Sequence, residues 1–164
     1  MRPGAANLHT FMNEFRITDE AIRHATCLAR SFHRWTGREL LGGLSGAELA
    51  EKLFTAPFVV VSHGTEADPV LNYGNQAALA LWEMTWEELT HTPSRLTAEA
   101  PNREERARLL AAVTRVGFIN NYSGVRISKS GRRFRIAQAI VWNLLTEEGR
   151  PCGQGATFAR WDFL

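Results

Sequence analysis

The sequence is poor in cysteine: only Cys27 and Cys152 occur among its 164 residues. They form neither a close pair nor a metal-ligand spacing, so we expect free thiols in a reducing compartment. No apolar run approaches the roughly 20 residues that cross a membrane, and no signal-peptide pattern opens the chain. We therefore expect a cytoplasmic protein that does not act at a membrane.

Motifs for catalysis and metal binding are also missing. The chain has no Gly-rich phosphate loop, no HExxH and no paired-carboxylate motif. Ser62 and His63 are adjacent, but neighbouring side chains on a strand point to opposite faces, so they make a poor nucleophile–base pair. His63 has no partner at a metal-ligand spacing. We expect neither enzymatic activity nor a metal site.

Charge gives little reason to expect a nucleic-acid partner, because the formal net charge is only +2. A solvated hairpin tip accounts for the one local excess of positive charge, since charges at a sheet edge block pairing with other chains. An anion-binding patch is the alternative interpretation. This basic cluster consists of Arg126, Lys129, Arg132, Arg133 and Arg135.

The hydrophobic content of 45% is ordinary for a soluble globular protein, and 164 residues suffice for one domain with a helical extension. Residues 1–55 form the expected extension. Thr18 begins a helix as its N-cap, apolar residues recur at helical spacing to about Trp35, and Gly37 ends it. Ser45 then begins a capping box and a short second helix.

Residues 56–164 alternate strands and helices. Asn75 is placed to cap one helix, Thr85 begins a second capping box, and Gly117 ends a longer helix. The order predicts an α+β domain with an antiparallel sheet. Strands are predicted over 58–62, 70–73, 117–145 (a hairpin) and 155–163, and helices over 76–82, 85–92 and 102–116.

The hairpin at 117–145 is expected to turn at Ser130-Gly131, a two-residue loop that glycine favours. If Lys129 lies opposite Arg132, ten residues share one face, and seven of them are apolar, so this is the expected core face. Its members are Ile119, Asn121, Ser123, Val125, Ile127, Phe134, Ile136, Gln138, Ile140 and Trp142. The expected outer face carries Tyr122, Arg126, Arg133, Arg135, Ala137, Ala139 and Val141.

Three polar residues on the expected core face, Asn121, Ser123 and Gln138, are the main candidates for a binding site. Buried polar groups need partners. Internal waters or loop backbone could satisfy them; alternatively, they are the polar contacts of a mostly apolar ligand pocket. The pocket walls would be Trp82 and Trp142, unless these are plain core. Arg95 is a further candidate: it could bind a carboxylate or phosphate at the mouth of the pocket, or form a structural salt bridge.

Two strands, short helices and three antiparallel strands are the order of a PAS domain. The stretch from Leu71 to Leu89, with the segments Pro93–Leu96, Gly124–Ser128 and Gly131–Phe134, closely resembles the bacterial form of the MEKHLA family, a PAS-like group. The resemblance covers roughly residues 10–164, although the hexapeptide that names the family is absent. It implies a stand-alone bacterial member with a PAS-like five-stranded antiparallel sheet and short helices on one face.

The resemblance also bears on cofactors. Flavin photosensors of the PAS group use a cysteine on a helix that has none here, and haem-binding members use a histidine on the long helix, which at 102–116 has none. The cofactor is therefore unknown, with non-covalent flavin or an organic acid left open. PAS relatives commonly dimerise through a leading helix and the outer sheet face.

The leading hypothesis for function is a small-molecule sensing module that acts through an unidentified protein partner. A pure interaction or dimerisation module is the alternative, and a small cone-fold enzyme is a third. We also expect a two-fold homodimer in which the first helix lies on the outer sheet face, its own or its partner's. That helix has an apolar stripe to cover, formed by Ile22, Leu28, Phe32 and Trp35.

Overall fold

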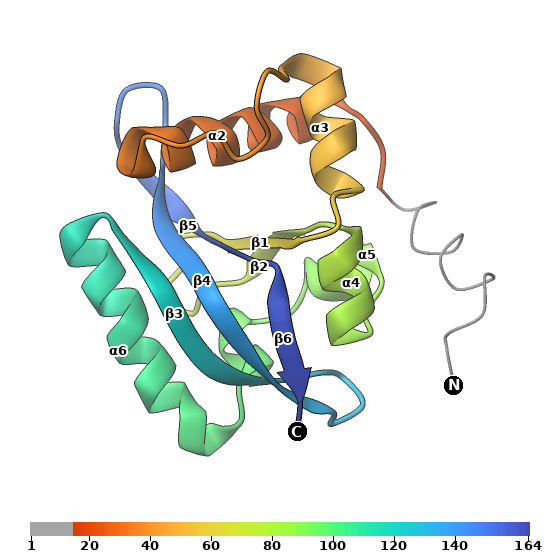
Figure 1. The fold of residues 1–164 in the computed structure, drawn as a ribbon, viewed down its shortest axis with the longest axis vertical. Helices are drawn as coiled ribbons and strands as arrows, with labels where there is room; N and C mark the ends of the chain where they lie inside the picture. The colour runs from red at the N-terminus through yellow and green to blue at the C-terminus, as the bar shows by residue number, and fades with distance from the viewer. Residues whose placement is uncertain (1–14) are drawn as a thin grey trace.

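The computed structural model describes residues 15–164, which form an antiparallel sheet with helices on both sides (Figure 1). In chain order the elements are α2 Asp19–Thr36, α3 Gly46–Phe54, β1 Val59–His63, β2 Leu71–Gly74, α4 Gln76–Trp82, α5 Trp86–Leu89, the 3-10 helix η1 Ser94–Thr97, α6 Ala100–Val116, β3 Phe118–Ile127, β4 Arg133–Leu145, β5 Pro151–Phe158 and β6 Arg160–Phe163.

The sheet has the strand order β2-β1-β5-β4-β3, and every pairing in it is antiparallel. β4 is long enough to pair with two strands along one edge: β5 lies beside its second half and β6 beside its first half. The strand expected over 155–163 is thus two strands that separate at Ala159. The predicted α+β class, with an N-terminal helix added to the sheet, is confirmed.

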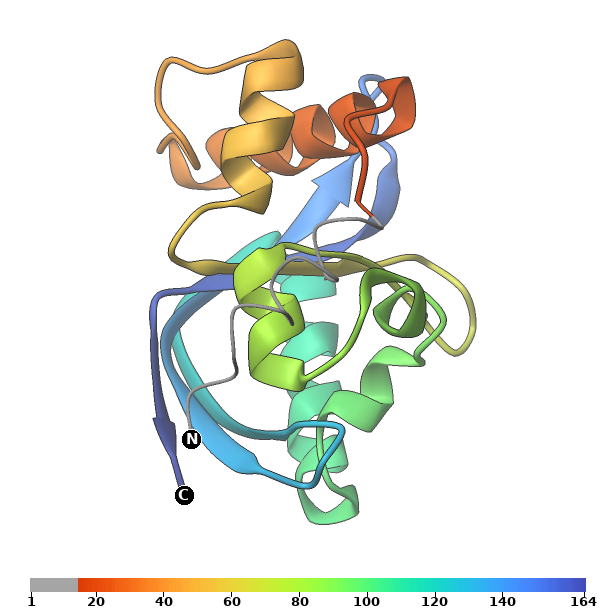
Figure 2. The same ribbon diagram turned by 90° about the vertical axis from the view of Figure 1, so that its right-hand side faces the viewer.

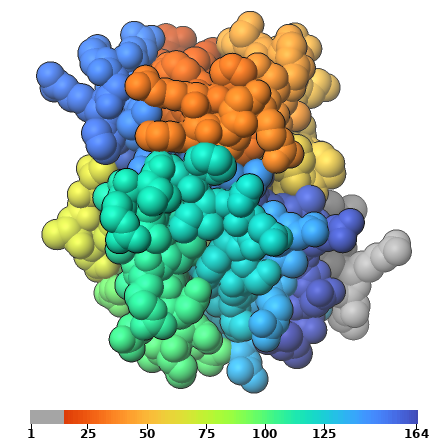
Figure 3. All heavy atoms as spheres, turned by 60° about the vertical axis from the view of Figure 1, so that its left-hand side comes forward, coloured from red at the N-terminus to blue at the C-terminus, as the bar shows by residue number. Residues whose placement is uncertain are grey.

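Two helical layers cover the two faces of the sheet (Figure 1 and Figure 2). α4 and α6 pack on the inner face, where Trp82 contacts Phe134 and Leu109 packs with Val141. α2 and α3 pack on the outer face, and Phe32 meets the Trp142 ring edge-on at 5.0 Å between ring centres. Figure 3 shows α2, in orange, directly above the teal surface of α6 and β3.

Local signals set the helix ends correctly in most places. Thr18 caps α2, with Oγ1 accepting from the Ala21 amide at 3.1 Å, and Gly37 ends the helix with a φ of 71°. The Ser45 side chain makes no capping bond to α3, so the capping box expected there is wrong. The other correction is α6, which begins at Ala100 and not at residue 102, with a proline in its first turn.

Asn75 connects both layers around β1. Its Oδ1 accepts from the amides of Ala78 in α4, at 3.2 Å, and Val60 in β1, at 3.0 Å. Its Nδ2 donates to the carbonyls of Leu53 at 3.1 Å and Phe58 at 2.8 Å. The predicted cap is confirmed, and the same fully buried side chain also fixes the chain that leads from α3 into the sheet.

The β3–β4 turn differs from the expected two-residue loop. Ser128 N–H donates to the Arg132 carbonyl at 2.9 Å, which leaves three residues in the loop, with Gly131 at a φ of 89°. This is the common three-residue hairpin with glycine in the left-handed position. It places Ile127 opposite Arg133, one residue from the predicted register.

A shift of one residue exchanges the faces of a strand, and two irregularities add to this effect. Asn121 and Gln138 both have a φ of 54°, and the pairing register shifts next to Asn121. Before Gln138, Phe134 and Ile136 point inward; after it, Ala139 and Val141 do, while Trp142 points to the outer face. The prediction that Trp142 shares a face with Phe134 is therefore wrong.

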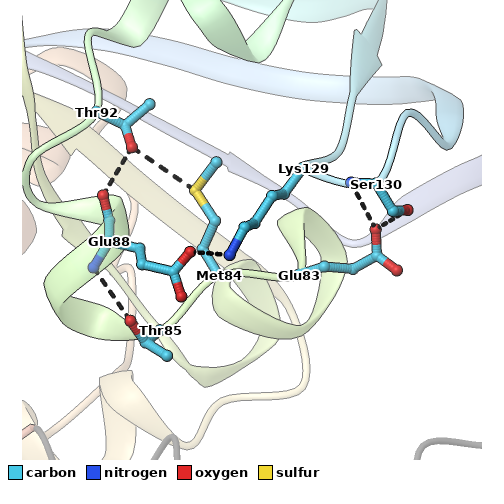
Figure 4. A network of polar contacts seen from close by, with 7 residues as sticks. All are labelled: Glu83, Met84, Thr85, Glu88, Thr92, Lys129 and Ser130. Atoms are coloured by element: carbon cyan, nitrogen blue, oxygen red, sulfur yellow. Dashed lines mark hydrogen bonds and ion pairs between the residues drawn. The ribbon is translucent and has the colours of Figure 1, made fainter.

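The hairpin tip is bound to the inner helices (Figure 4). Glu83 accepts from Ser128 Oγ at 2.6 Å and from the Ser130 hydroxyl, and Lys129 pairs with Glu88. The hydroxyls of Ser128 and Ser130 hold the pKa of Glu83 below its usual value. The tip thus closes the inner layer at the end of α4, where the Lys129 amide also donates to the Trp82 carbonyl at 3.0 Å.

Candidate functional site

Most of the predicted site residues lie away from the inner layer. Asn121, Ser123 and Gln138 are exposed. They share no cavity with the core, so the prediction that they form a buried polar trio is wrong. The one-residue register shift and the bulged positions at Asn121 and Gln138 are the physical reason.

The remaining three predicted residues have separate positions. Trp142 is completely buried between the sheet and α2, so it is core and not a pocket wall. Arg95 is exposed and its Nε lies 3.2 Å from Asp68 Oδ1, which is the structural salt bridge considered as the alternative. Trp82 alone lies at the inner cavity.

A cavity of about 60 Å³ lies between the inner face of the sheet and helices α4 and α6. A water molecule needs roughly 10–15 Å³ measured in this way, so the space would hold about four to six waters. Most of its wall is apolar, and a few polar side chains converge on it, as in typical ligand sites. The apolar wall includes Val61, Leu109, Ile136, Val141, Ala156 and Phe158.

Arg126 lines this cavity from β3 and is only 6% exposed. Its Nη1 donates to the Val125 carbonyl at 2.9 Å and its Nη2 to the Tyr122 hydroxyl at 3.1 Å. The Tyr122 hydroxyl in turn donates to Glu105 Oε2 at 2.9 Å. Burial raises the pKa of Tyr122, so the phenol stays protonated and Arg126 has no anion in contact.

Arg106 reaches the same cavity from α6. Among residues 15–164 no ion pair includes either arginine, and Arg106 has no hydrogen-bond partner there. Burial, with a smaller contribution from the positive charge of Arg126, lowers the pKa of Arg106 to about 10. Arg106 stays protonated at neutral pH, so two cations share one largely apolar cavity.

Two more polar groups at the cavity are buried without a partner in the described chain: His63 Nε2 and Trp82 Nε1. His63 Nδ1 lies 2.9 Å from the Gly64 carbonyl, which can only accept, so Nδ1 carries the proton and Nε2 is a free acceptor. Burial lowers the pKa of His63, and Arg106 lowers it further. The ring is therefore neutral at pH 7, and Trp82 Nε1 is a free donor.

Sequence reasoning missed these residues for an identifiable reason. Arg126 and Tyr122 were assigned to the outer face because the hairpin loop was counted one residue too short. With the observed register Arg126 lies opposite Phe134, which is fully buried. Arg106 gives no signal in the sequence, because its place at the cavity depends on how α6 packs on the sheet.

Within residues 15–164 no group of three or more His, Cys, Asp and Glu side chains could hold a metal ion. Every helix in this range is too short or too polar to span a bilayer. The cavity with its two unpaired cations is the candidate site.

Comparison with known proteins agrees with this architecture. The pattern of the MEKHLA domain matches residues 22–163, which include most of α2 and the whole sheet. The chain belongs to the MEKHLA domain family. The match begins within α2, so the pattern of the family includes most of the first helix.

Homeobox-leucine zipper proteins of plants contain related regions. The homeobox-leucine zipper protein ATHB-9 of Arabidopsis thaliana is 27% identical over an alignment of 169 positions, which covers 99% of this chain and 19% of ATHB-9. HOX10 of Oryza sativa subsp. indica is 24% identical over 147 residues, 88% of this chain and 18% of HOX10. This MEKHLA chain thus spans about a fifth of the length of these relatives.

Solved structures share the PAS fold at low sequence identity. The PAS domain of a Colwellia psychrerythraea protein has a TM-score of 0.57 at 14% identity and covers 66% of this chain and 90% of its own. An RNA-binding light-oxygen-voltage receptor has a TM-score of 0.61 at 17% identity, covering 74% of this chain and 36% of its own. The MEKHLA chain therefore has a PAS-like fold.

Proposed function

We propose that this MEKHLA domain is a sensing module that binds a small molecule in its inner cavity and acts through a protein partner. The observation that carries the proposal is a small, mostly apolar cavity lined by Arg106 and Arg126, at which the buried His63 Nε2 and Trp82 Nε1 have no partner among residues 15–164. Unpaired buried polar groups cost about 1–3 kcal/mol each, so a domain that only served as a scaffold would gain stability by replacing them.

The sheet supplies a route from the cavity to the outer surface. His63 faces the cavity, and the neighbouring residue on β1, Ser62, faces α2, where its Oγ lies 2.9 Å from His24 Nε2. At the other end of α2 the Trp35 ring lies against Gly117, where an added Cβ would come within 2.4 Å of it. A ligand that displaces β1 or α6 would thus move contacts made by α2, and α2 presents its other side to solvent.

The test of sensing is whether the cavity holds a molecule. Protein purified from cells is denatured, and released small molecules are identified by mass spectrometry and added back to the purified domain. Ala156→Leu adds three carbons inside the cavity and should abolish binding, whereas Ala137→Leu, outside it, should bind normally. A wild-type domain that releases nothing and binds no compound from a metabolite library would contradict sensing and favour the interaction module.

Catalysis has a weaker basis. Ser62 Oγ donates its only proton to Asn72 Oδ1 at 2.6 Å, so His24 donates to Ser62 and does not act as its base. The order of hydrogen bonds is opposite to that of an activated serine. We therefore retain the non-enzymatic module as the proposed function.

Self-association stays a prediction, as do the bacterial origin, the stand-alone arrangement and the division of the chain at residue 55. Leu28 and Phe32 are already buried against the chain's own sheet, so the first helix needs no second copy to cover them. A two-fold dimer would have to bury other surface. Sedimentation at tens of micromolar decides this, and a monomer there would exclude the proposed dimer.

A further inference from the structure

We propose that the ligand of the inner cavity is a small organic carboxylate whose negative charge is shared by Arg126 and Arg106. This inference rests on the proposed sensing function and adds the chemical class of the ligand. It depends on three properties of the cavity: its charge, its size and the chemistry of its wall.

The charge of the cavity is the first step. Arg126 in β3 and Arg106 in α6 both line the same small space, and the charge of Arg126 is close enough to lower the pKa of Arg106. The nearest acid in this network, Glu105, accepts from Tyr122 and forms no ion pair with either arginine. Cations taken out of water need a compensating charge, and two of them close together need it more. The described protein does not provide that charge, so an anionic ligand would.

The size of the cavity and the planar shape of the guanidinium groups limit the chemical class of the ligand. A space for about four to six water-sized groups accommodates a carboxylate of roughly two to four carbons and is too small for a nucleotide or a flavin. The planar fork of a guanidinium matches a carboxylate through two parallel hydrogen bonds. The apolar wall of Leu109, Val141 and Phe158 suits a short hydrocarbon chain, which free phosphate lacks. Trp82 Nε1 adds a further donor for the anion.

The experiment compares two molecules of the same shape that differ in charge. Sodium propionate and the neutral propionamide are titrated into the purified domain by calorimetry, with sodium chloride at equal ionic strength as the blank; acetate, butyrate and pyruvate follow. We expect saturable binding of at least one carboxylate and none of propionamide. Arg126→Met and Arg106→Met should each weaken binding by at least about thirtyfold, because each substitution leaves the buried carboxylate with only one of its two arginine partners.

A control variant separates binding from folding. Arg108→Met removes an exposed arginine from the same helix, where it pairs only with Glu104, and should leave carboxylate binding unchanged. Arg106→Met should also raise the unfolding temperature of the ligand-free domain, because it removes one of two like charges. A purely structural role of Arg106 predicts the opposite sign.

The outcomes distinguish this inference from the sensing function. If propionamide or another neutral compound binds as tightly as its carboxylate and Ala156→Leu abolishes that binding, sensing stands and the anionic class is wrong. If no carboxylate binds at about 10 mM, the inference is overturned as well. The proposed sensing function is contradicted as well only if the denatured protein also releases no small molecule.

Discussion

The sulfur of Cys27 in α2 lies 3.8 Å from the sulfur of Cys152 in β5, across 125 positions of sequence. Both thiols are free and partly buried, and burial, with the neighbouring Cys27, raises the pKa of Cys152 to about 11. No sequence pattern pairs the two cysteines, because only the docking of α2 on the outer face brings them together. This contact joins the first helix to the sheet.

Oxidation should convert this contact into a covalent bond. We expect oxidised glutathione to accept the two electrons and protons of the Cys27 and Cys152 thiols and leave as two reduced molecules, which yields an internal disulfide. Closing so long a loop would stabilise the fold by up to about 4 kcal/mol and protect α2 from proteolysis. Mass spectrometry of the alkylated protein measures the loss of two hydrogens.

Cys152→Ser is the control for this reaction, since it leaves Cys27 in place with no partner. It should give only a mixed disulfide with glutathione and gain no resistance to proteolysis. If the unsubstituted domain also ends with glutathione on each cysteine and no internal bond, the two sulfurs do not approach closely enough in solution, and the prediction is wrong.

Asn75→Ala should be among the most destabilising single substitutions. It removes four hydrogen bonds at a fully buried position and leaves the Val60 amide and the Leu53 and Phe58 carbonyls without their partner. At about 1–3 kcal/mol for each unsatisfied group, the loss should exceed about 3 kcal/mol in urea unfolding. Thr85→Ala, which removes only an N-cap, should cost about 1 kcal/mol. Equal losses would show that Asn75 is no more than a cap.

Acid should destabilise the domain through His24. Burial lowers the pKa of His24 from 6.5 to about 4, against a smaller opposing effect of Glu20. Between these values the unfolded chain binds a proton that the folded chain does not, so stability is complete above pH 6.5 and falls as the pH drops towards 4. The loss should be about 3 kcal/mol. His24→Gln keeps a donor for Ser62 but does not titrate, so its stability should vary less over this range; an unchanged profile would exclude His24 as the cause.

Much of the fold was predictable because its signals are local. Thr18, Gly37, Asn75 and Gly117 act within one turn of their own helix, and each ends or begins a helix where the sequence indicated. The faces of β3 and β4 were not predictable in the same way. They depend on one extra residue in a turn and on the left-handed backbone at Gln138, and a single such change moves every later side chain to the other face.

The candidate site was missed for the same reason. The candidates were polar residues at positions expected to face inward, and with the faces inverted these positions are Asn121 and Ser123 in place of Tyr122 and Arg126. Asn121 itself carried a usable signal, because asparagine tolerates the left-handed conformation that shifts the register here. The closeness of Arg106 to Arg126 depends on how α6 crosses the sheet, a tertiary relationship that no short segment encodes.

The last prediction links carboxylate binding to the protonation of His63. In the ligand-free domain burial lowers the pKa of His63; Arg106 lowers it further, while the Gly64 carbonyl and Glu66 raise it. A carboxylate in so small a cavity would oppose both lowering effects and raise this pKa, so binding would take up a proton at Nε2. Affinity for propionate should then increase as the pH falls through the range between the ligand-free and ligand-bound pKa values. Calorimetry at fixed pH in buffers of different ionisation enthalpy measures the proton taken up, and His63→Gln should abolish the uptake. If the unsubstituted domain and His63→Gln take up the same number of protons on binding propionate, the carboxylate does not bind close to His63 and the prediction is wrong.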